Sequence, residues 1–86
     1  MVYQVQIRRE AKRKLQSLPV KERLRITDKI MELGLDPDDA NLDTTPLTGS
    51  RFWRLRVGNW RVIYDRQEVL RIIAVERIRS RGDVYK

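Results

Sequence analysis

Residues 51–65, RFWRLRVGNWRVIYD, combine arginines with large apolar side chains in a pattern that could bind phosphate. A guanidinium group is planar and permanently charged, so it can contact two phosphate oxygens at once. Alternation of polar and apolar residues around Gly58-Asn59 predicts a β-hairpin with a two-residue turn. In that register Arg56 lies directly opposite Arg61, and facing like charges destabilise a strand pair. A phosphate between the two guanidinium groups would turn this repulsion into attraction.

The same register divides the hairpin, Phe52–Val57 and Trp60–Asp65, into two faces. One face is basic and holds Arg54, Arg56 and Arg61. Outward arginines also serve solubility and blunt sheet edges, but that alternative explains an arginine facing an arginine poorly. A phosphate site is therefore the favoured hypothesis. The other face is apolar and can be covered by helices; it comprises Trp53, Leu55, Val57, Trp60, Val62 and Tyr64.

More basic residues and a tyrosine follow near the end of the sequence. Arg77, Arg79 and Arg81 occupy alternate positions, on a strand expected to pair beside the second hairpin strand. That pairing would bring them toward the basic face. Clustered arginines favour the phenolate form of a nearby tyrosine, which makes Tyr85 a candidate base. Stacking on a nucleobase is its alternative role.

The chemistry open to these residues is narrow. The chain has no histidine and no cysteine, so a histidine acid–base pair, a cysteine nucleophile and a thiolate metal site are excluded. RNA can nevertheless be cleaved by its own 2′-hydroxyl, which attacks the adjacent phosphate. The reaction needs charge stabilisation on the phosphorane, a proton acceptor and a proton donor. Clustered arginines supply the first, and no carboxylate is expected on the basic face.

The charge distribution is uneven along the 86 residues, whose net charge is +7. Residues 1–31 carry +6, residues 32–50 carry −5 and residues 51–86 carry +6. In the last block nine of the ten bases are arginine. Such a protein most often binds nucleic acid or an acidic partner, although charge alone supports a solvated basic surface equally well.

These side chains must be positioned by one small domain, residues 1–86, with a single modest core. Val2–Arg8 alternates as a half-buried strand. Two helices are expected on either side of Pro19, from Arg9 to Leu18 and from Val20 to Leu33, with Gly34 ending the second. The buried stripe of the second helix is expected to comprise Leu24, Thr27, Ile30, Met31 and Leu33.

Residues 36–50 are predicted to form a loop. Its aspartates do not fit a calcium loop, because there is no glycine at the turn position and no terminal glutamate. Turn and cap chemistry is the better interpretation, and no metal or other cofactor is expected. After a turn at Arg66–Glu68, a third C-terminal strand is predicted over Val69–Ile78. The order β-α-α-β-β-β predicts an α+β fold, with the N-terminal strand and helical hairpin packed on a mainly antiparallel sheet.

The N-terminal residues MVYQVQIRREAK lack the apolar core of a signal peptide, and no apolar run is long enough to span a membrane. The expected location is therefore the cytoplasm.

The sequence resembles the RelE/ParE superfamily of bacterial and archaeal toxin–antitoxin toxins. The likeness covers nearly the whole chain and is carried by KRKLQSLP, LTGSRFWRLRVGNWRVIYD and VERIRSRGDVYK. The resemblance implies a small sheet backed by two helices. It also implies a cytoplasmic toxin neutralised by an antitoxin that wraps around it and is short and acidic in its toxin-binding part. Operator DNA would be bound only through the antitoxin complex.

Within the superfamily the RelE branch is the better match. Its members cleave mRNA in the ribosomal A site and thereby inhibit translation, using basic residues and a C-terminal tyrosine. Many relatives place a histidine just before an arginine near the C-terminus, whereas Ser80 precedes Arg81 here. Matched by motif, a metal-independent catalytic set would comprise Arg56, Arg61, Arg79 and Tyr85, with Arg54 and Arg81 binding RNA.

Two other functions stay open. Members of the ParE branch inhibit DNA gyrase with the same fold but usually lack this complete set of residues. A non-catalytic protein that binds only nucleic acid or its antitoxin is the third function considered.

Overall fold

The computed structural model describes residues 2–80, and the predicted site residues Arg81 and Tyr85 lie outside that range. The elements are β1 (Gln4–Ile7), α1 (Arg9–Ser17), α2 (Val20–Leu35), β2 (Asp43–Pro46), β3 (Phe52–Val57), β4 (Trp60–Gln67) and β5 (Ile72–Ser80). The predicted α+β class is confirmed. Neither of the two described helices has the length and apolarity needed to span a membrane.

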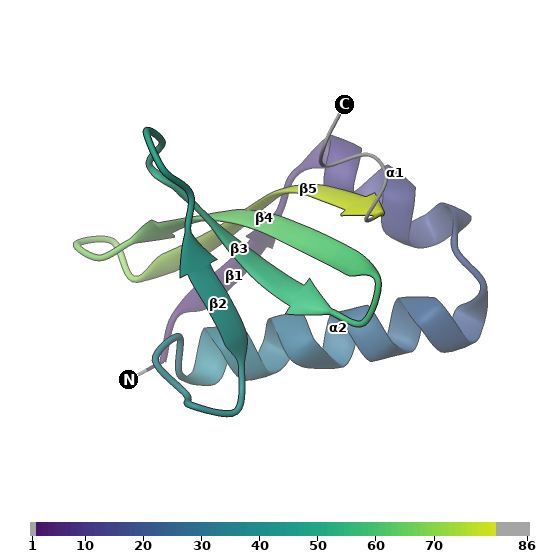
Figure 1. The fold of residues 1–86 in the computed structure, drawn as a ribbon, viewed down its shortest axis with the longest axis horizontal. Helices are drawn as coiled ribbons and strands as arrows, with labels where there is room; N and C mark the ends of the chain where they lie inside the picture. Colours follow the sequence, from purple (N-terminus) through teal and green to yellow (C-terminus); the bar gives the residue numbers. More distant parts are fainter. Residues whose placement is uncertain (1, 81–86) are drawn as a thin grey trace.

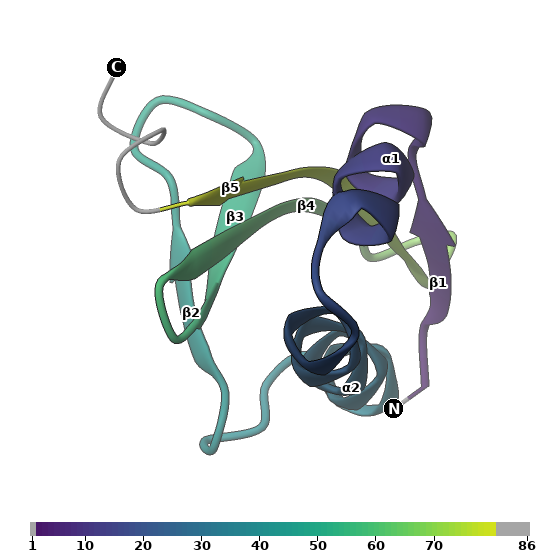
Figure 2. The ribbon, with the colours of Figure 1, turned by 90° about the vertical axis from the view of Figure 1, so that its right-hand side faces the viewer.

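The five strands form one twisted sheet in the order β1-β5-β4-β3-β2. β1 runs parallel to β5, and all other neighbours are antiparallel. α2 lies behind the sheet and α1 lies beside β5 (Figure 1). Figure 2 shows both helices on the same side of β3 and β4, while no described helix covers the other side. We call this uncovered side of β2, β3, β4 and β5 the open face.

The predicted hairpin register is confirmed, from Val57 opposite Trp60 to Trp53 opposite Tyr64. At the turn, Gly58 has φ +60°, whereas Asn59 does not have a positive φ. A positive φ at the first central residue alone is the pattern of a type II′ turn, which favours glycine there. A Cβ atom on Gly58 would also lie 3.1 Å from both terminal guanidinium nitrogens of Arg25. The positive φ therefore favours glycine at this position, whereas the exposed Arg25 side chain could move aside for a Cβ atom.

The core lies between the sheet and the helices. The apolar hairpin face is buried as predicted at Leu55, Val57, Val62 and Tyr64, whereas the two tryptophans are only half-buried. The Trp60 indole donates a 3.1 Å hydrogen bond to Glu22 of α2. This face packs against Ile26, Ile30 and Leu33 of α2 and joins Ile73, Val75 and Ile78 of β5 in one cluster.

The prediction for α2 was wrong in two respects. Leu24 and Met31 are more than half exposed, and Ile26 is buried in their place. Ile30 and Leu33 are buried as predicted, and with Ile26 they follow an i, i+4, i+7 spacing that defines a face rotated about the helix axis from the predicted stripe. Gly34 does not end the helix, which continues to Leu35.

Gly34 instead lets β1 pass close to α2. The Gly34 carbonyl accepts a 2.7 Å hydrogen bond from the Tyr3 N–H. A Cβ atom on Gly34 would lie 2.7 Å from Cγ2 of Val5, too close for any unstrained contact. The glycine is therefore required by packing rather than by helix termination.

The boundaries after residue 36 also differ from the prediction. Residues 43–46 form the edge strand β2 instead of a loop. β4 continues to Gln67, and β5 begins at Ile72 because Val69 and Leu70 lie in the exposed turn between them. The aspartates of the preceding segment act as predicted in turns, since Asp36 and Asp39 each accept a backbone N–H two residues ahead.

The ionisation of the buried Tyr64 should make the stability of the fold depend on pH in the alkaline range. Burial of the Tyr64 hydroxyl raises its pKa to about 12. An unfolded tyrosine ionises near pH 10, so the free energy of unfolding should fall as the pH rises from 10 to 12. Tyr64→Phe lacks this ionisation and should gain about 1 kcal/mol relative to the wild type between pH 8 and pH 11, measured by urea unfolding. An unchanged difference between the two proteins would show that Tyr64 does not stay neutral in the fold.

Candidate functional site

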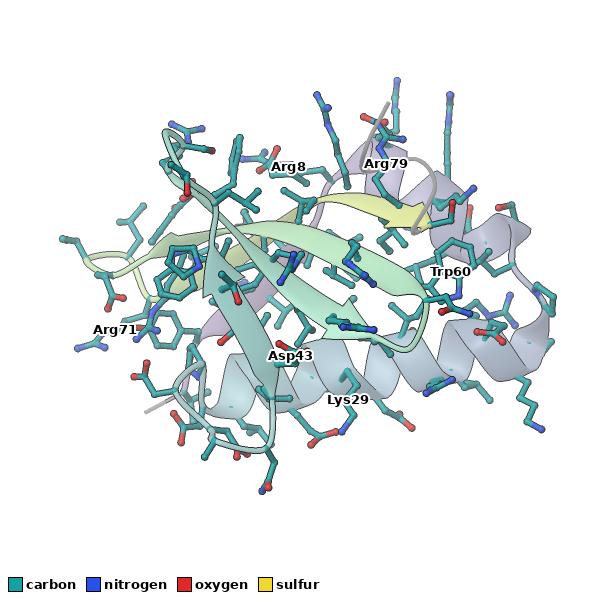
Figure 3. All side chains as sticks on the ribbon, viewed as in Figure 1. Arg8, Lys29, Asp43, Trp60, Arg71 and Arg79 are labelled. Atoms are coloured by element: carbon teal, nitrogen blue, oxygen red, sulfur yellow. The ribbon has the colours of Figure 1, made fainter. Side chains whose placement is uncertain are left out.

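A row of charged residues crosses the open face, one from each of four strands. Asp43 of β2 lies opposite Arg56 of β3, which lies opposite Arg61 of β4, which lies opposite Arg79 of β5. Directly paired residues project from the same side of a sheet. We call Arg56, Arg61 and Arg79 the arginine row. In Figure 3, Asp43 on β2 and Arg79 beside α1 mark the two ends of this line.

A second line of paired residues lies next to the arginine row. It runs from Thr45 through Arg54 and Ile63 to Arg77. The sheet therefore brings together all the predicted site residues that fall within residues 2–80, namely Arg54, Arg56, Arg61 and Arg79.

Arg61 is buried, although it was predicted to lie on the basic face that the helices do not cover. Only 4% of its surface is exposed. One terminal nitrogen donates to the Trp60 carbonyl at 3.2 Å and to the Gly58 carbonyl at 3.4 Å. The Nε atoms of Arg61 and Arg54 are buried without a hydrogen-bond partner in the described chain. A buried cation with unused donors costs free energy, so this position is poorly explained by folding stability alone.

The Gly58 carbonyl oxygen partly offsets the electrostatic repulsion between Arg56 and Arg61. It accepts from the Arg56 Nε at 3.5 Å as well as from Arg61. Both contacts are long and therefore weak. Arg25 adds a third guanidinium at the same turn, because a Cβ on Gly58 would contact it. No spacing or motif predicted a place for Arg25 at this turn, since it is an exposed cation on α2.

The prediction that no carboxylate lies on the basic face was wrong. Asp43 is opposite Arg56 because residues 43–46 add a strand to the sheet. At the other end, Oε1 of Glu10 accepts a 2.9 Å hydrogen bond from Arg79, and its Oε2 lies 3.8 Å from Nε of Arg77. Carboxylates therefore accompany both ends of the arginine row, whereas the buried Arg61 in the middle has none among residues 2–80.

The described tyrosines cannot serve the arginine row as bases. Tyr3 and Tyr64 are both buried in the core on the helix side of the sheet. Glu68 accepts a 2.6 Å hydrogen bond from the Tyr3 hydroxyl, which fixes that side chain. What the described residues offer is charge stabilisation of an anion by guanidinium groups, without a tyrosine base among them.

Comparison with known families agrees with this geometry. Residues 5–85 match the model of a family described as the ParE toxin of the type II toxin–antitoxin system parDE. The chain belongs to the ParE toxin family. It is thus a member of the RelE/ParE superfamily and a toxin of the type II toxin–antitoxin class. A search of curated protein sequences found no match.

Solved structures similar to this ParE-family chain include RelE toxins in complex with antitoxins. The archaeal RelE–RelB complex from Pyrococcus horikoshii OT3 is 29% identical, with a TM-score of 0.82 over 95% of this chain and 98% of that one. The RelB–RelE complex from Methanococcus jannaschii is 24% identical, with a TM-score of 0.77 over 94% and 95%. The RelBE2 complex from Mycobacterium tuberculosis is 18% identical, with a TM-score of 0.78 over 94% and 100%. The fold is therefore RelE-like.

Proposed function

We propose that this toxin is a ribosome-dependent endoribonuclease that cuts mRNA in the A site and thereby inhibits translation. The observation that carries the proposal is the arginine row, with the buried Arg61 at its centre and its Nε unpartnered. A phosphate bound there would face a cluster of permanently charged guanidinium groups. It would also relieve the repulsion between Arg56 and Arg61.

In this proposal the row stabilises a phosphorane. The 2′-oxygen of the RNA attacks the adjacent phosphorus, and Tyr85 takes its proton as a phenolate. Arg56 and Arg61 bind the phosphate oxygens that gain charge. Arg79 stabilises the 5′-oxygen as its bond to phosphorus breaks, and this oxygen then takes a proton from water. The products are a 2′,3′-cyclic phosphate and a free 5′-hydroxyl.

The remaining predicted residues would hold the RNA. Arg54 lies one line away from the row on the same face of the sheet, so it is placed to contact a neighbouring phosphate. Arg81 is assigned the same role from the sequence alone.

The proposal includes an antitoxin partner in the cytoplasm. Support comes from the solved complexes, in which RelE toxins are bound to RelB. A partner that is acidic in its toxin-binding part would complement the basic open face, and operator DNA would be bound through that complex.

Inhibition of DNA gyrase is the second candidate function. It is favoured by the family match, which is to a ParE toxin, and it needs no cleavage chemistry. The two candidates predict different consequences when the chain is induced without its antitoxin. The nuclease produces new mRNA 5′ ends within translated codons, whereas the gyrase inhibitor reduces supercoiling and leaves mRNA intact.

Induction of a Tyr85→Phe variant tests the assignment of the base. Loss of the hydroxyl should reduce A-site cleavage roughly 100-fold, because general base catalysis typically contributes 10² to 10⁴. Tyr64→Phe is the matched control, since it removes a hydroxyl from the core and should cleave like the wild type. Wild-type cleavage by Tyr85→Phe, measured by mapping mRNA 5′ ends, would remove Tyr85 from the mechanism.

A further inference from the structure

A second basic feature lies beside the arginine row, between α1 and the end of β5. It is a groove of about 370 Å³. The residues that matter here are Arg9, Glu10, Arg13, Lys14, Ser17 and Arg79. All except Arg79 come from α1, and Figure 3 shows Arg79 next to that helix.

The charges of the groove are unbalanced. Among the described residues, its lining holds four cations and one carboxylate, that of Glu10, which is already bound to Arg79 at 2.9 Å. Arg9 and Arg13 are one helical turn apart, so they project from the same side of α1. Both are exposed, and neither forms an ion pair with a described residue. Lys14 lies 5.6 Å from the centre of the Trp60 ring, which holds that side chain against the fold.

Arg79 belongs to both features. It ends the arginine row in the sheet register and also lines the groove. A chain of phosphates that passes Arg56 and Arg61 therefore meets Arg79 and can continue along α1 past Arg13 and Arg9. Guanidinium groups spaced along this path carry permanent positive charges and are therefore suited to binding a polyanionic backbone.

We propose that this groove binds the sugar–phosphate backbone of the single-stranded RNA next to the cleaved bond. The inference rests on the proposed function for its substrate, but it makes a separate claim about binding. Glu10 competes with the RNA, because its carboxylate occupies the Arg79 guanidinium that a phosphate would contact. Substitutions in the groove should thus shift RNA affinity in both directions.

The test is fluorescence anisotropy with a labelled 12-nucleotide single-stranded RNA whose riboses are 2′-O-methylated and cannot be cleaved. In Arg9→Ala/Arg13→Ala the Kd should rise roughly 10- to 30-fold at 0.1 M salt, since each contact to a single strand contributes a factor of about 5 there. The slope of log K against log salt should fall by about 1.4. Glu10→Gln should bind the same RNA more tightly than the wild type.

Lys12→Ala/Lys21→Ala is the matched control. It removes the same charge from exposed positions that do not line the groove, and its Kd should change by about threefold or less because exposed charges are screened within about 10 Å at 0.1 M salt. Equal losses in the two double variants, or no loss in Arg9→Ala/Arg13→Ala, would overturn the proposal. A larger loss with duplex DNA than with RNA would also overturn it.

The binding test and the proposed function can fail independently. If the wild type does not cleave ribosome-bound mRNA but the groove variants bind RNA weakly, the groove is an RNA-binding site and the nuclease assignment is wrong. If the groove variants bind RNA like the wild type while the wild type cleaves mRNA, only the groove is wrong.

Discussion

Arg61→Met is expected to lose at least about 100-fold of the rate of mRNA cleavage, the usual cost of removing one transition-state donor from a preorganised site. The same variant should be as stable as the wild type, or more stable by about 1 to 2 kcal/mol, because apolar replacement of a buried charge is often neutral or stabilising. Methionine replaces the arginine side chain as far as the Nε position with apolar atoms, which limits the cavity that is left. The two measurements are single-turnover cleavage on programmed ribosomes and urea unfolding.

The cleavage rate and the stability of Arg61→Met together show whether Arg61 serves the reaction or the fold. Arg61 is 4% exposed and has an unpartnered Nε, so folding gains little from its charge. Arg56→Met is the control, since it relieves the same Arg56–Arg61 repulsion from an exposed position and should therefore raise stability less than Arg61→Met. A clear loss of stability in Arg61→Met would mean that the guanidinium is part of the fold and that its burial says nothing about RNA.

Arg79→Ala should reduce cleavage about 100-fold, whereas Arg77→Ala should reduce it less than about fivefold. The two arginines are two positions apart on β5, and both contact Glu10. They differ in register, because Arg79 lies opposite Arg61 and Arg77 lies opposite Ile63. Each of the two variants removes one positive charge from β5, so a difference between their cleavage rates measures the effect of membership in the arginine row.

Single-turnover rates at saturating ribosome concentration measure this difference without the effect of binding. Both variants should unfold at similar urea concentrations, since exposed ion pairs contribute about 0 to 1 kcal/mol. Equal losses of rate in the two variants would show that general positive charge, and not the arginine row, drives the reaction.

The hairpin was predictable because its signals are local. Alternation and a Gly-Asn turn fixed which residues face each other, and the structure has the same pairs from Trp53 to Trp60. The position of Arg79 followed from one further strand pairing. Such registers are strongly specified when one face of the sheet is buried.

The carboxylates beside the row were not predictable in the same way. Glu10 reaches Arg79 through tertiary packing of α1 along β5, which no spacing in the sequence encodes. Asp43 had a weak signal, since two threonines follow it and favour a strand, but Pro46 argued for a loop. Proline is tolerated there because β2 is an edge strand. The burial of Arg61 likewise depends on how its side chain folds back over the turn carbonyls.

We propose that the arginine row promotes cleavage of mRNA in the ribosomal A site, with the 2′-hydroxyl of the RNA as the nucleophile. The most direct measurement mixes the purified chain with ribosomes stalled on an mRNA of defined A-site codon and analyses the ends of the fragments. We expect a cut in that codon with a 2′,3′-cyclic phosphate on the upstream fragment. No cut should occur without ribosomes, and Arg61→Met should cut the mRNA much more slowly than the wild type. Intact mRNA in the presence of the wild-type chain, together with inhibition of gyrase supercoiling, would contradict this proposal.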